Sequence, residues 1–387
     1  MNESRTSTSL KDSVTSKNWE LVKVGEIASF SSGKSISVSS LKTQSPDTPI
    51  PVYGGNGIAG YTSRSLTDSR TIVVGRVGQK CGEVHLTKGP AWVTDNALYP
   101  HRIRQRVDLR FLALALEMAG LNEIRLRNDL PLVTQPILHA AQIALPAKLE
   151  EQRAIADALS DVDALIERLD ALIAKKRAIK TATMQRLLTG KQRLPGFDGD
   201  WTTKRLGEIA SKRNERVKPN PSNHEDFCIE LEHVGQGTGT LTGSTRTTPT
   251  SSLKAVFYED DILFAKLRSY LRKYWLADKQ GVCSTEIWVL TTEDGEILPS
   301  YLYHHVTRDQ FIEAASKAHG THMPRADWKV VKDYEIELPP IDEQEAIATI
   351  LSDMDAEIDA LQARREKTQA IKQGMMQELL TGRTRLA

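Results

Sequence analysis

Hydrophobic residues recur at alternating intervals of four and three along two separate stretches of the chain. This spacing is the a/d stripe of a coiled coil, which is narrower than the apolar face of a globular surface helix. The sequence therefore predicts two long helices, each of about 40 residues and roughly 60 Å at 1.5 Å per residue. The stripe positions are Ile155, Leu159, Val162, Ile166, Leu169 and Ile173 in the first stretch, and Ile347, Leu351, Met354, Ile358 and Leu361 in the second.

The two helical stretches are near copies of each other. About 25 of 44 positions are identical when residues 151–194 are aligned with residues 343–386. The segments before them also open alike, with WELVKVGEIAS from Trp19 and WTTKRLGEIAS from Trp201, although most of each segment then differs. A repeat of this length predicts a two-fold skeleton that carries two unlike heads. The expected segments are a polar tail at 1–17, a first head at 18–144, a helical spacer at 145–194, a second head at 195–337 and a second spacer at 338–387.

Charge order along each helix predicts how the two helices pair. Both are acidic in their first half and basic later, as from Lys175 to Lys180 and from Arg364 to Lys372. A parallel pair would set acid against acid, whereas an antiparallel pair sets each acidic half against a basic half, so we expect antiparallel helices. Charged or polar residues interrupt the stripe in mid-helix, and we interpret them as fixing register and solvating the surface, with a phosphate backbone as the alternative partner. They are Lys176, Lys180, Arg365, Thr368 and Lys372.

The heads have mixed patterns, so the predicted fold class is α+β. Short β-branched or aromatic runs at 71–74, 262–264 and 286–290 predict strands, and residues 109–118 and 301–315 have helical spacing. The glycine-rich stretch YGGNGIAGY at 53–61 has no Lys-Ser/Thr after it, so a turn between strands is expected rather than a phosphate loop. Pro146 and Pro340 suit helix starts, and Gly190 and Gly382 suit helix ends.

Composition excludes several classes of protein. The 387 residues suffice for two or three domains, and no run of 18 apolar residues predicts a membrane span. Three scattered cysteines, Cys81, Cys228 and Cys283, read as buried thiols and fit a reducing cytoplasm. The first head carries 14 Lys/Arg against 10 Asp/Glu, and the second carries 18 against 22. Only the first head is therefore basic in bulk, and any polyanion site on the second must be a local cluster.

The search for catalytic motifs returns little. Nucleotide-phosphate and methyltransferase signatures are absent from the sequence, and the nine histidines have no metal-ligand spacing. Asp327-Trp328-Lys329 resembles a nuclease strand triplet, but a triplet this short arises by chance. We expect no catalytic residue, no metal and no cofactor bound by this chain.

Each head instead carries one cluster of side chains suited to nucleic acid. Arg, Asn and Gln make bidentate bonds to base edges, and Lys serves phosphates. The alternative is a solvated, charged edge strand. The candidate DNA-binding residues are Lys34, Asn56, Tyr61, Arg64, Arg76, Gln79 and Lys80 in the first head, and Arg246, Lys266, Arg268, Tyr270, Arg272 and Lys273 in the second.

With these features the chain resembles the specificity subunit of Type I restriction-modification systems. The resemblance rests on the helix starts, LPAKLEEQRAIADALSDVD from Leu145 and LPPIDEQEAIATILSDMD from Leu338, and on the matching ends, MQRLLTGKQRL and MQELLTGRTRL. The head openings, the YGGNGIAGY stretch and the approach from Thr321 to Pro324 also fit. The motif at the first helix start has one more residue between its Leu-Pro and its Glu-Gln pair than the second motif has. The two helices are therefore expected to begin slightly differently.

The resemblance implies a non-catalytic DNA reader and scaffold. Each head would be a target recognition domain for one half of an asymmetric split sequence in double-stranded DNA, and the helices would be an antiparallel coiled-coil spacer. Two methyltransferase subunits would dock on the repeated helices, where we expect Glu151, Gln152, Glu343 and Gln344 to bind them. Those partners would bring S-adenosylmethionine, and restriction subunits would bring ATP and Mg²⁺. Two other hypotheses stay open, namely an adaptor whose heads bind proteins and an enzyme with its own nuclease site.

Overall fold

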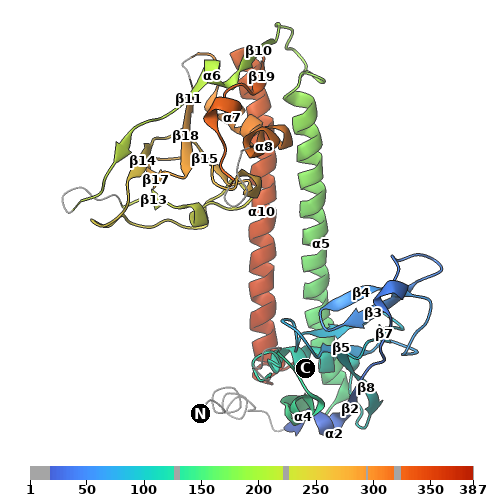
Figure 1. Cartoon of the computed structure of the whole chain (residues 1–387). Coiled ribbons are helices and arrows are strands. Elements are labelled where there is room, and N and C mark those ends of the chain that lie inside the picture. Colours follow the sequence, from blue (N-terminus) through green and yellow to red (C-terminus); the bar gives the residue numbers. More distant parts are fainter. Residues whose placement is uncertain (1–17, 126–130, 221–225, 293–294, 318–323, 387) are drawn as a thin grey trace. The chain divides into compact units, whose positions relative to one another are not determined.

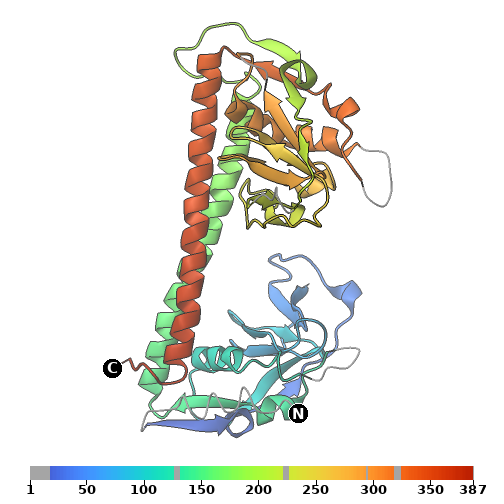
Figure 2. The same cartoon turned by 90° about the vertical axis from the view of Figure 1, so that its left-hand side faces the viewer.

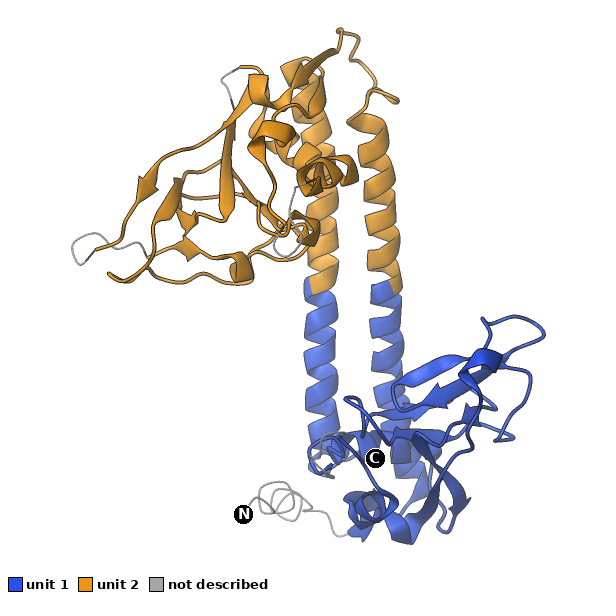
Figure 3. Ribbon diagram, viewed as in Figure 1, with its two compact units in different colours: residues 1–170, 363–387 blue, residues 171–362 orange. Residues whose placement is uncertain are grey.

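The computed structural model describes residues 18–125, 131–220, 226–292, 295–317 and 324–386 (Figure 1). The predicted polar tail 1–17 and Thr321 lie outside them. The chain divides into two compact units: unit 1 comprises residues 1–170 and 363–387, and unit 2 comprises residues 171–362 (Figure 3). Each unit combines one head with part of both long helices, so the five expected segments are not five separate bodies.

Two helices of equal length account for the repeated stretches. Helix α5 spans Leu149–Leu187 and helix α10 spans Ile341–Leu379, with 39 residues each. Both begin two residues before their Glu-Gln pair, so the expectation of unlike starts is wrong. The extra residue comes before the helix, since two residues separate Pro146 from Leu149 and one separates Pro339 from Ile341. Gly190 and Gly382 follow the helix ends with positive φ of 64° and 74°, as the glycine ends predict.

In unit 1 the two helical segments run in opposite directions. Asp163 pairs with Lys372 at 2.7 Å and Asp170 with Arg365 at 3.0 Å, so residue numbers rise along one helix as they fall along the other. The hydroxyl of Thr368 is buried and donates to the Arg364 carbonyl at 2.8 Å. These polar interruptions of the stripe therefore fix register rather than leaving free cations.

The same order holds in unit 2, where the helical segments also lie side by side (Figure 2). Lys176 pairs with Glu357 at 2.6 Å, and Lys180 pairs with Asp355. In each unit an acidic half thus faces a basic half, which confirms the predicted antiparallel pairing within the units.

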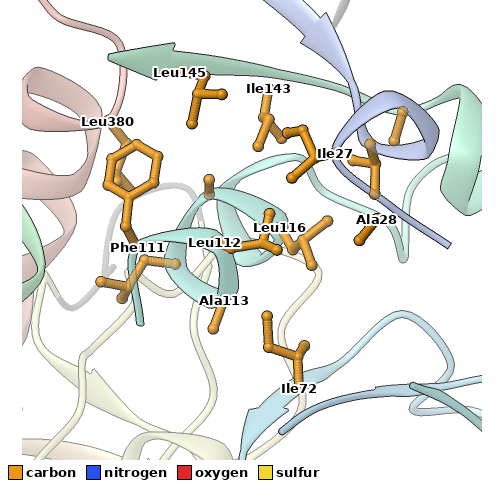
Figure 4. Packing of buried hydrophobic residues seen from close by; sticks show 14 of the residues in the cluster. Ile27, Ala28, Ile72, Phe111, Leu112, Ala113, Leu116, Ile143, Leu145 and Leu380 are labelled. Atoms are coloured by element: carbon orange, nitrogen blue, oxygen red, sulfur yellow. The ribbon is translucent and has the colours of Figure 1, made fainter. Parts of the chain in front are cut away.

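The stripe residues pack in two different environments along each helix. Ile155 and Leu159 of α5 pack in the core of the first head, together with Leu379 and Leu380 from the end of α10. Figure 4 shows Leu380 beside Phe111 in this core. In unit 2, Ile347 and Leu351 likewise share a core with Leu187 and Leu188. The first turns of each helix therefore belong to a head core, and only the later stripe residues are left to face the opposite helix.

Although their sequences differ, the two heads have matching topologies. Each is closed by an antiparallel pair of its first and last strands, β1 with β9 and β10 with β19, and each has a four-stranded sheet, ordered β2-β8-β5-β6 in the first head and β11-β18-β15-β16 in the second. A further sheet follows in each, ordered β4-β3-β7 and β12-β14-β17-β13. The strands are as follows: β1 Trp19–Lys23, β2 Ala28–Ser32, β3 Ile50–Gly54, β4 Gly57–Thr62, β5 Ile72–Gly75, β6 Val84–Leu86, β7 Trp92–Val93, β8 Ala97–Ile103, β9 Gln142–Pro146, β10 Thr202–Arg205, β11 Ala210–Lys212, β12 Arg216–Val217, β13 Cys228–Ile229, β14 Lys254–Phe257, β15 Ile262–Ala265, β16 Tyr274–Leu276, β17 Gly281–Ser284, β18 Ile287–Thr292 and β19 Glu335–Leu338.

Short helices link these strands and confirm the mixed α and β prediction. The predicted helix at 109–118 matches α3, whereas the predicted helix at 301–315 is two helices, α7 and α8, separated at Thr307 and Arg308. The three cysteines are buried free thiols, as expected, and burial raises the pKa of Cys228 to about 11. The short helices are α2 Val24–Ile27, α3 Leu109–Met118, α4 Gln135–Ala140, α6 Leu206–Ile209, α7 Pro299–Val306, α8 Asp309–Ser316 and α9 Trp328–Val331, with 3₁₀ turns at Val38–Ser40, Leu231–His233 and Ser269–Leu271.

A buried carboxylate ties three distant segments together in unit 1. Glu151, near the start of α5, is 5% exposed and accepts two hydrogen bonds of 2.8 Å from Arg385, beyond the end of α10. The indole of Trp19, which opens the first head, donates to the same carboxylate at 3.3 Å. The first head, the start of α5 and the segment after α10 therefore all contact one carboxylate.

Unit 2 repeats this cluster. Glu343 is fully buried and accepts bonds from Arg193 at 2.9 and 2.6 Å and from the Trp201 indole at 3.0 Å. Gly190, next to Trp201, leaves no room for a side chain without displacing the ring, since an added Cβ would lie 3.3 Å from it. A buried charge is tolerated when it is paired and hydrogen bonded, as here.

The adjacent glutamines also form hydrogen bonds within the chain. Gln152 accepts from the Asp108 amide and donates to the Pro146 carbonyl, both at 2.9 Å. Gln344 bonds the Leu298 amide at 3.0 Å. The expected partner-binding role of Glu151, Gln152, Glu343 and Gln344 is therefore corrected, because all four side chains are buried and occupied.

Replacing Glu343 with Gln should lower the free energy of unfolding by about 2 kcal/mol, because charge-assisted bonds from Arg193 and Trp201 are lost. Urea titration of the full chain measures this. Glu345→Gln, an exposed change two residues along α10, is the matched control and should stay within about 0.5 kcal/mol of the wild type. An equal decrease in the free energy of unfolding in both variants would contradict the proposed contribution of the cluster to stability.

Two buried histidines on α7 should make unit 2 sensitive to acid. Burial, with Lys180 nearby, lowers the pKa of His304 to about 3, and burial with Arg308 and His304 lowers that of His305 well below its usual value. An unfolded histidine takes up its proton near pH 6.5, which the folded ring cannot do. Stability is therefore present above pH 6.5 and falls as pH drops toward 3, by about 1.4 kcal/mol per pH unit for each histidine. His305→Phe should make the free energy of unfolding less dependent on pH, by about 1.4 kcal/mol per pH unit, in urea titrations between pH 5 and 6.5. An unchanged dependence would contradict the role given to His305.

Candidate nucleic-acid interface

Part of each cluster chosen from the sequence lies at an equivalent place in its head. In the first head the hairpin loop 76–83 joins β5 to β6, and in the second head the hairpin loop 266–273 joins β15 to β16. Both loops close with a backbone bond of 2.9 Å from the last strand residue, Gly75 to Glu83 and Ala265 to Lys273. The sheet therefore presents each cluster at the same edge of its own head.

A crossing segment holds each hairpin loop by matching backbone bonds. Val133 donates to Arg76, and Ala326 donates to Lys266, at 2.9 and 2.8 Å. The amides two residues further along each loop, Gly78 and Arg268, donate to Pro131 and Pro324 at 3.1 and 2.8 Å. These matching contacts are main-chain bonds, which any side chain permits, so the loop side chains can differ between the heads without losing them.

The third loop position needs a positive φ in both heads. Gly78 has φ of 100°, while Arg268 has φ of 53°, a left-handed conformation uncommon for a residue with a Cβ. Arg272, after the 3₁₀ turn, has the same φ of 53°. The second loop therefore places two arginines on either side of one short turn.

A groove of about 400 Å³ lies beside the first hairpin loop. The YGGNGIAGY stretch forms the predicted turn, here between β3 and β4, and its Gly55 packs against the Val77 carbonyl so closely that an added Cβ would lie 2.4 Å from it. Asn56 and Asn96 supply amides to the groove, and the exposed Val38 and Ile58 supply apolar surface. The lining residues are Ile36, Val38, Leu41, Gly54 to Ala59, Val77, Gly78 and Thr94 to Asn96.

Three first-head candidates, Arg76, Gln79 and Lys80, lie on the hairpin loop. Gln79 and Lys80 are exposed on the hairpin loop, and the Lys80 amine lies 3.7 Å from Glu83. Arg76 is half-buried and donates to the Ser32 hydroxyl at 3.1 Å and the Asp95 carbonyl at 3.3 Å. Its guanidinium is therefore held in place rather than free.

Two further candidates share a tryptophan. The Arg64 guanidinium lies 5.4 Å from the centre of the Trp92 ring, and the Trp92 indole donates to the Lys34 carbonyl at 2.9 Å. The side chains of Arg64 and Lys34 are both exposed, whereas Tyr61 is half-buried on β4. Sequence reasoning missed Asn96 and the apolar rim, because their only link to Asn56 is the packing of separate loops.

In the second head the predicted cluster separates into exposed and occupied side chains. Arg268 and Tyr270 are exposed, and Lys266 is half-buried. Arg272 forms an ion pair with Asp309, and the Lys273 amine donates to the Leu231 carbonyl at 2.6 Å. The prediction that these residues bind DNA stays a prediction, and Arg272 and Lys273 already make contacts within unit 2.

Arg246 lies on a different loop and pairs with Asp226 at 3.3 Å, both side chains being largely exposed. An exposed pair of this kind contributes little to stability and can exchange partners. The sequence did not identify Lys212, which directly follows the repeated GEIAS segment and packs against two tryptophan rings near Lys266.

The nuclease hypothesis loses its structural basis. Asp327 does not end a strand but caps the start of α9, where its carboxylate accepts the Lys329 amide at 3.0 Å. Within the described ranges, His, Cys, Asp and Glu side chains form no group of three that could hold a metal ion. No described helix combines the length and apolar character needed to cross a membrane.

Comparison with known proteins agrees with this duplicated architecture. The family model for the Type I restriction modification DNA specificity domain matches residues 16–175 and again 198–372, most of the chain. The chain is 24% identical to the Type I restriction enzyme MjaVIII specificity subunit of Methanocaldococcus jannaschii, over 96% of this chain and 94% of that protein. It is 20% identical to the EcoDI specificity subunit of Escherichia coli, over 94% and 87%. The crystal structure of the S subunit of a Type I restriction-modification system from M. genitalium has a similar fold, with a TM-score of 0.64 and 17% identity over 94% of this chain and 96% of that chain.

Proposed function

The chain belongs to the family of Type I restriction-modification DNA specificity subunits, and on that premise we propose that it reads an asymmetric, two-part DNA sequence with its two heads. One observation carries the proposal: two unlike sets of side chains occupy one backbone frame, the hairpin loops 76–83 and 266–273. A shared frame suits the same target molecule, and unlike side chains suit unlike half-sites.

The first head would read its half-site with the groove and the hairpin loop beside it. Asn56, Asn96 and Gln79 offer amides of the type that bond adenine edges, and Arg76 offers a guanidinium that the Ser32 and Asp95 contacts already orient. Lys80, Lys34 and Arg64 are exposed cations suited to backbone phosphates. In the second head Arg268 and Tyr270 are the corresponding exposed side chains.

The helices would serve as the spacer between half-sites. At 39 residues each, α5 and α10 are about 58 Å long at 1.5 Å per residue. Half-sites one turn of DNA apart are separated by about 34–36 Å, which a rod of this length can bridge. The cross-helix ion pairs support a defined register within each unit.

Two copies of a methyltransferase subunit would dock around the repeated helices, and restriction subunits would join through them. Because the Glu-Gln pairs are buried, docking would use the exposed helix positions outside the stripe, among them Leu172, Ile179 and Ile371. Exposed apolar residues of this kind are typical of protein interfaces. In this proposal S-adenosylmethionine, ATP and Mg²⁺ belong to the partners, and this chain supplies sequence recognition and geometry.

The adaptor alternative, in which the heads bind proteins, remains as a second candidate because the second head is acidic overall. It differs from the main proposal in one measurable way. A DNA reader loses affinity steeply as salt rises, because phosphate contacts release counterions, whereas a protein-binding head has no DNA affinity to lose.

Sequencing of methylated DNA from a strain with and without this chain tests the proposal directly. We expect one new adenine-methylated motif, split into two unlike halves by unspecified bases. A strain that carries the chain and the methyltransferase yet gains no motif would contradict it, and a palindromic motif would contradict the assignment of different half-sites to the heads.

Arg268→Ala should weaken binding to the matched duplex by about 1–3 kcal/mol and relax the preference at one base pair, because the exposed guanidinium is proposed to bond a base edge. Arg272→Ala is the matched control, since Arg272 has the same φ and flanks the same turn but is paired with Asp309. Titration against duplexes with single base-pair changes measures both. Equal loss of preference in the two variants would place specificity elsewhere.

A further inference from the structure

An unpaired cluster of cations gathers on the second head, away from the contacts that occupy Arg272 and Lys273. Lys212 ends β11, and its amine lies 5.7 Å from the centre of the Trp288 ring and 5.5 Å from that of Trp328. The two rings meet edge to face, with centres 5.6 Å apart. The lysine is therefore held by aromatic surface instead of by a carboxylate.

The strand register explains this placement. Lys212 pairs with Leu290 across β11 and β18, and Trp288 lies two residues before Leu290, so both side chains project from the same face of the sheet. Trp328 reaches this face because Asp327 caps α9 and starts the helix there. Three separate segments thus build one site.

The charges around Lys212 do not cancel. Burial lowers the pKa of the Lys212 amine, Lys266 and Arg216 lower it further, and Asp327 alone opposes them. Within the described parts of the chain, Lys212, Lys266 and Arg216 have no ion-pair partner. Like charges gathered in a partly desolvated site cost free energy unless an anion joins them.

Ion pairs account for only some of the cations of this head. Seven of its 18 Lys and Arg residues have carboxylate partners, and Lys212, Lys266 and Arg268 are among the described ones that have none. Although the head is acidic overall, unpaired cations that lie close together create a local positive potential that attracts an anion. The seven ion pairs are Lys204–Glu296, Arg205–Asp333, Arg213–Asp261, Arg246–Asp226, Lys254–Glu230, Arg272–Asp309 and Arg325–Glu286.

The first head has no counterpart of this site. By strand register and helix start, the positions of Lys212, Trp288 and Trp328 correspond to Phe30, Leu98 and Gln135. Phe30 and Leu98 are buried core residues. The cluster is therefore not part of the duplicated skeleton but an addition to the second head.

We propose that Lys212, with Lys266 and Arg216, binds a backbone phosphate of the DNA beside the second half-site. This inference rests on the proposed function. A lysine serves phosphate as a point charge and carries no base information, so the site would supply affinity and orientation, not sequence preference. Its position at the start of the hairpin loop puts it next to Arg268 and Tyr270, the side chains proposed to read bases.

The test compares Lys212→Gln with Lys279→Gln in the full chain, together with its methyltransferase partner. Lys279 is the matched control because its amine also lies over an aromatic ring, 4.1 Å from the centre of Phe227, but outside the cluster. Affinities are measured against salt for a duplex carrying the methylated motif and for a scrambled duplex of equal length. Lys212→Gln should reduce the slope of log affinity against log salt by about 0.9 and weaken both duplexes roughly fivefold at 0.15 M salt. Lys279→Gln should change neither, and Lys212→Arg should restore both.

Each other outcome has a distinct meaning. An unchanged slope in Lys212→Gln, with specific binding by the wild type, overturns the phosphate site and leaves the proposed function standing. A loss of preference at one base pair also overturns it, because Lys212 would then read a base. Weaker association with the methyltransferase and unchanged DNA binding would assign the cluster to a protein partner and overturn it. A wild-type complex that binds neither duplex overturns both proposals.

Amine labelling of the wild type provides a second measurement that needs no variant to fold. Acetylation of Lys212 should slow when the matched or the scrambled duplex is added, while that of Lys279 should not, as read by mass spectrometry. Equal labelling of Lys212 with and without DNA would overturn the proposal.

Discussion

The structure depends on one electrostatic constraint, which is met twice: a carboxylate buried at the start of a long helix must find its donors elsewhere in the chain. Glu151 and Glu343 each take them from an arginine beyond the end of the opposite helix and from the tryptophan that opens a head. A buried charge without these partners would be costly, so head, helix start and helix end must assemble together. The same constraint places the closing Leu-Leu of one helix in the head core that holds the first turns of the other.

Fixing the skeleton in this way leaves the heads free to diverge. The hairpin loops are held by main-chain bonds to a crossing segment, and no loop side chain is needed to make those bonds. Side chains can then change without loss of the frame. One head presents a groove with amides and apolar residues, and the other presents arginine, tyrosine and a lysine against two tryptophans. A sequence reader that must recognise two unlike half-sites gains from this separation of frame and surface.

Charge alone does not identify the candidate interface. In the second head seven of the 18 Lys and Arg residues already have carboxylate partners, and those without one can take up an external anion at less cost. Pairing is decided by geometry, since Arg268 and Arg272 flank one turn with the same backbone angle and only the second meets an aspartate. The repeated Glu-Gln pairs are a second example. These polar residues recur in the sequence, yet they are hydrogen-bond donors and acceptors inside the structure and not a surface for a partner.

Periodicity, repetition and charge order in the sequence by themselves determined the two helices, their antiparallel pairing within each unit and the mixed α and β heads, and the motifs at the helix starts and ends carried the resemblance to the family. These features depend on local spacing and on charge order, which are written along the chain. Only the tertiary structure decided which polar side chains are occupied, that the stripe begins inside the head cores, that the two predicted clusters share one frame, and that Lys212 meets Trp288 and Trp328. Each of these depends on segments far apart in sequence packing against one another, and a burial or an ion pair between such segments leaves no periodic trace in either segment alone.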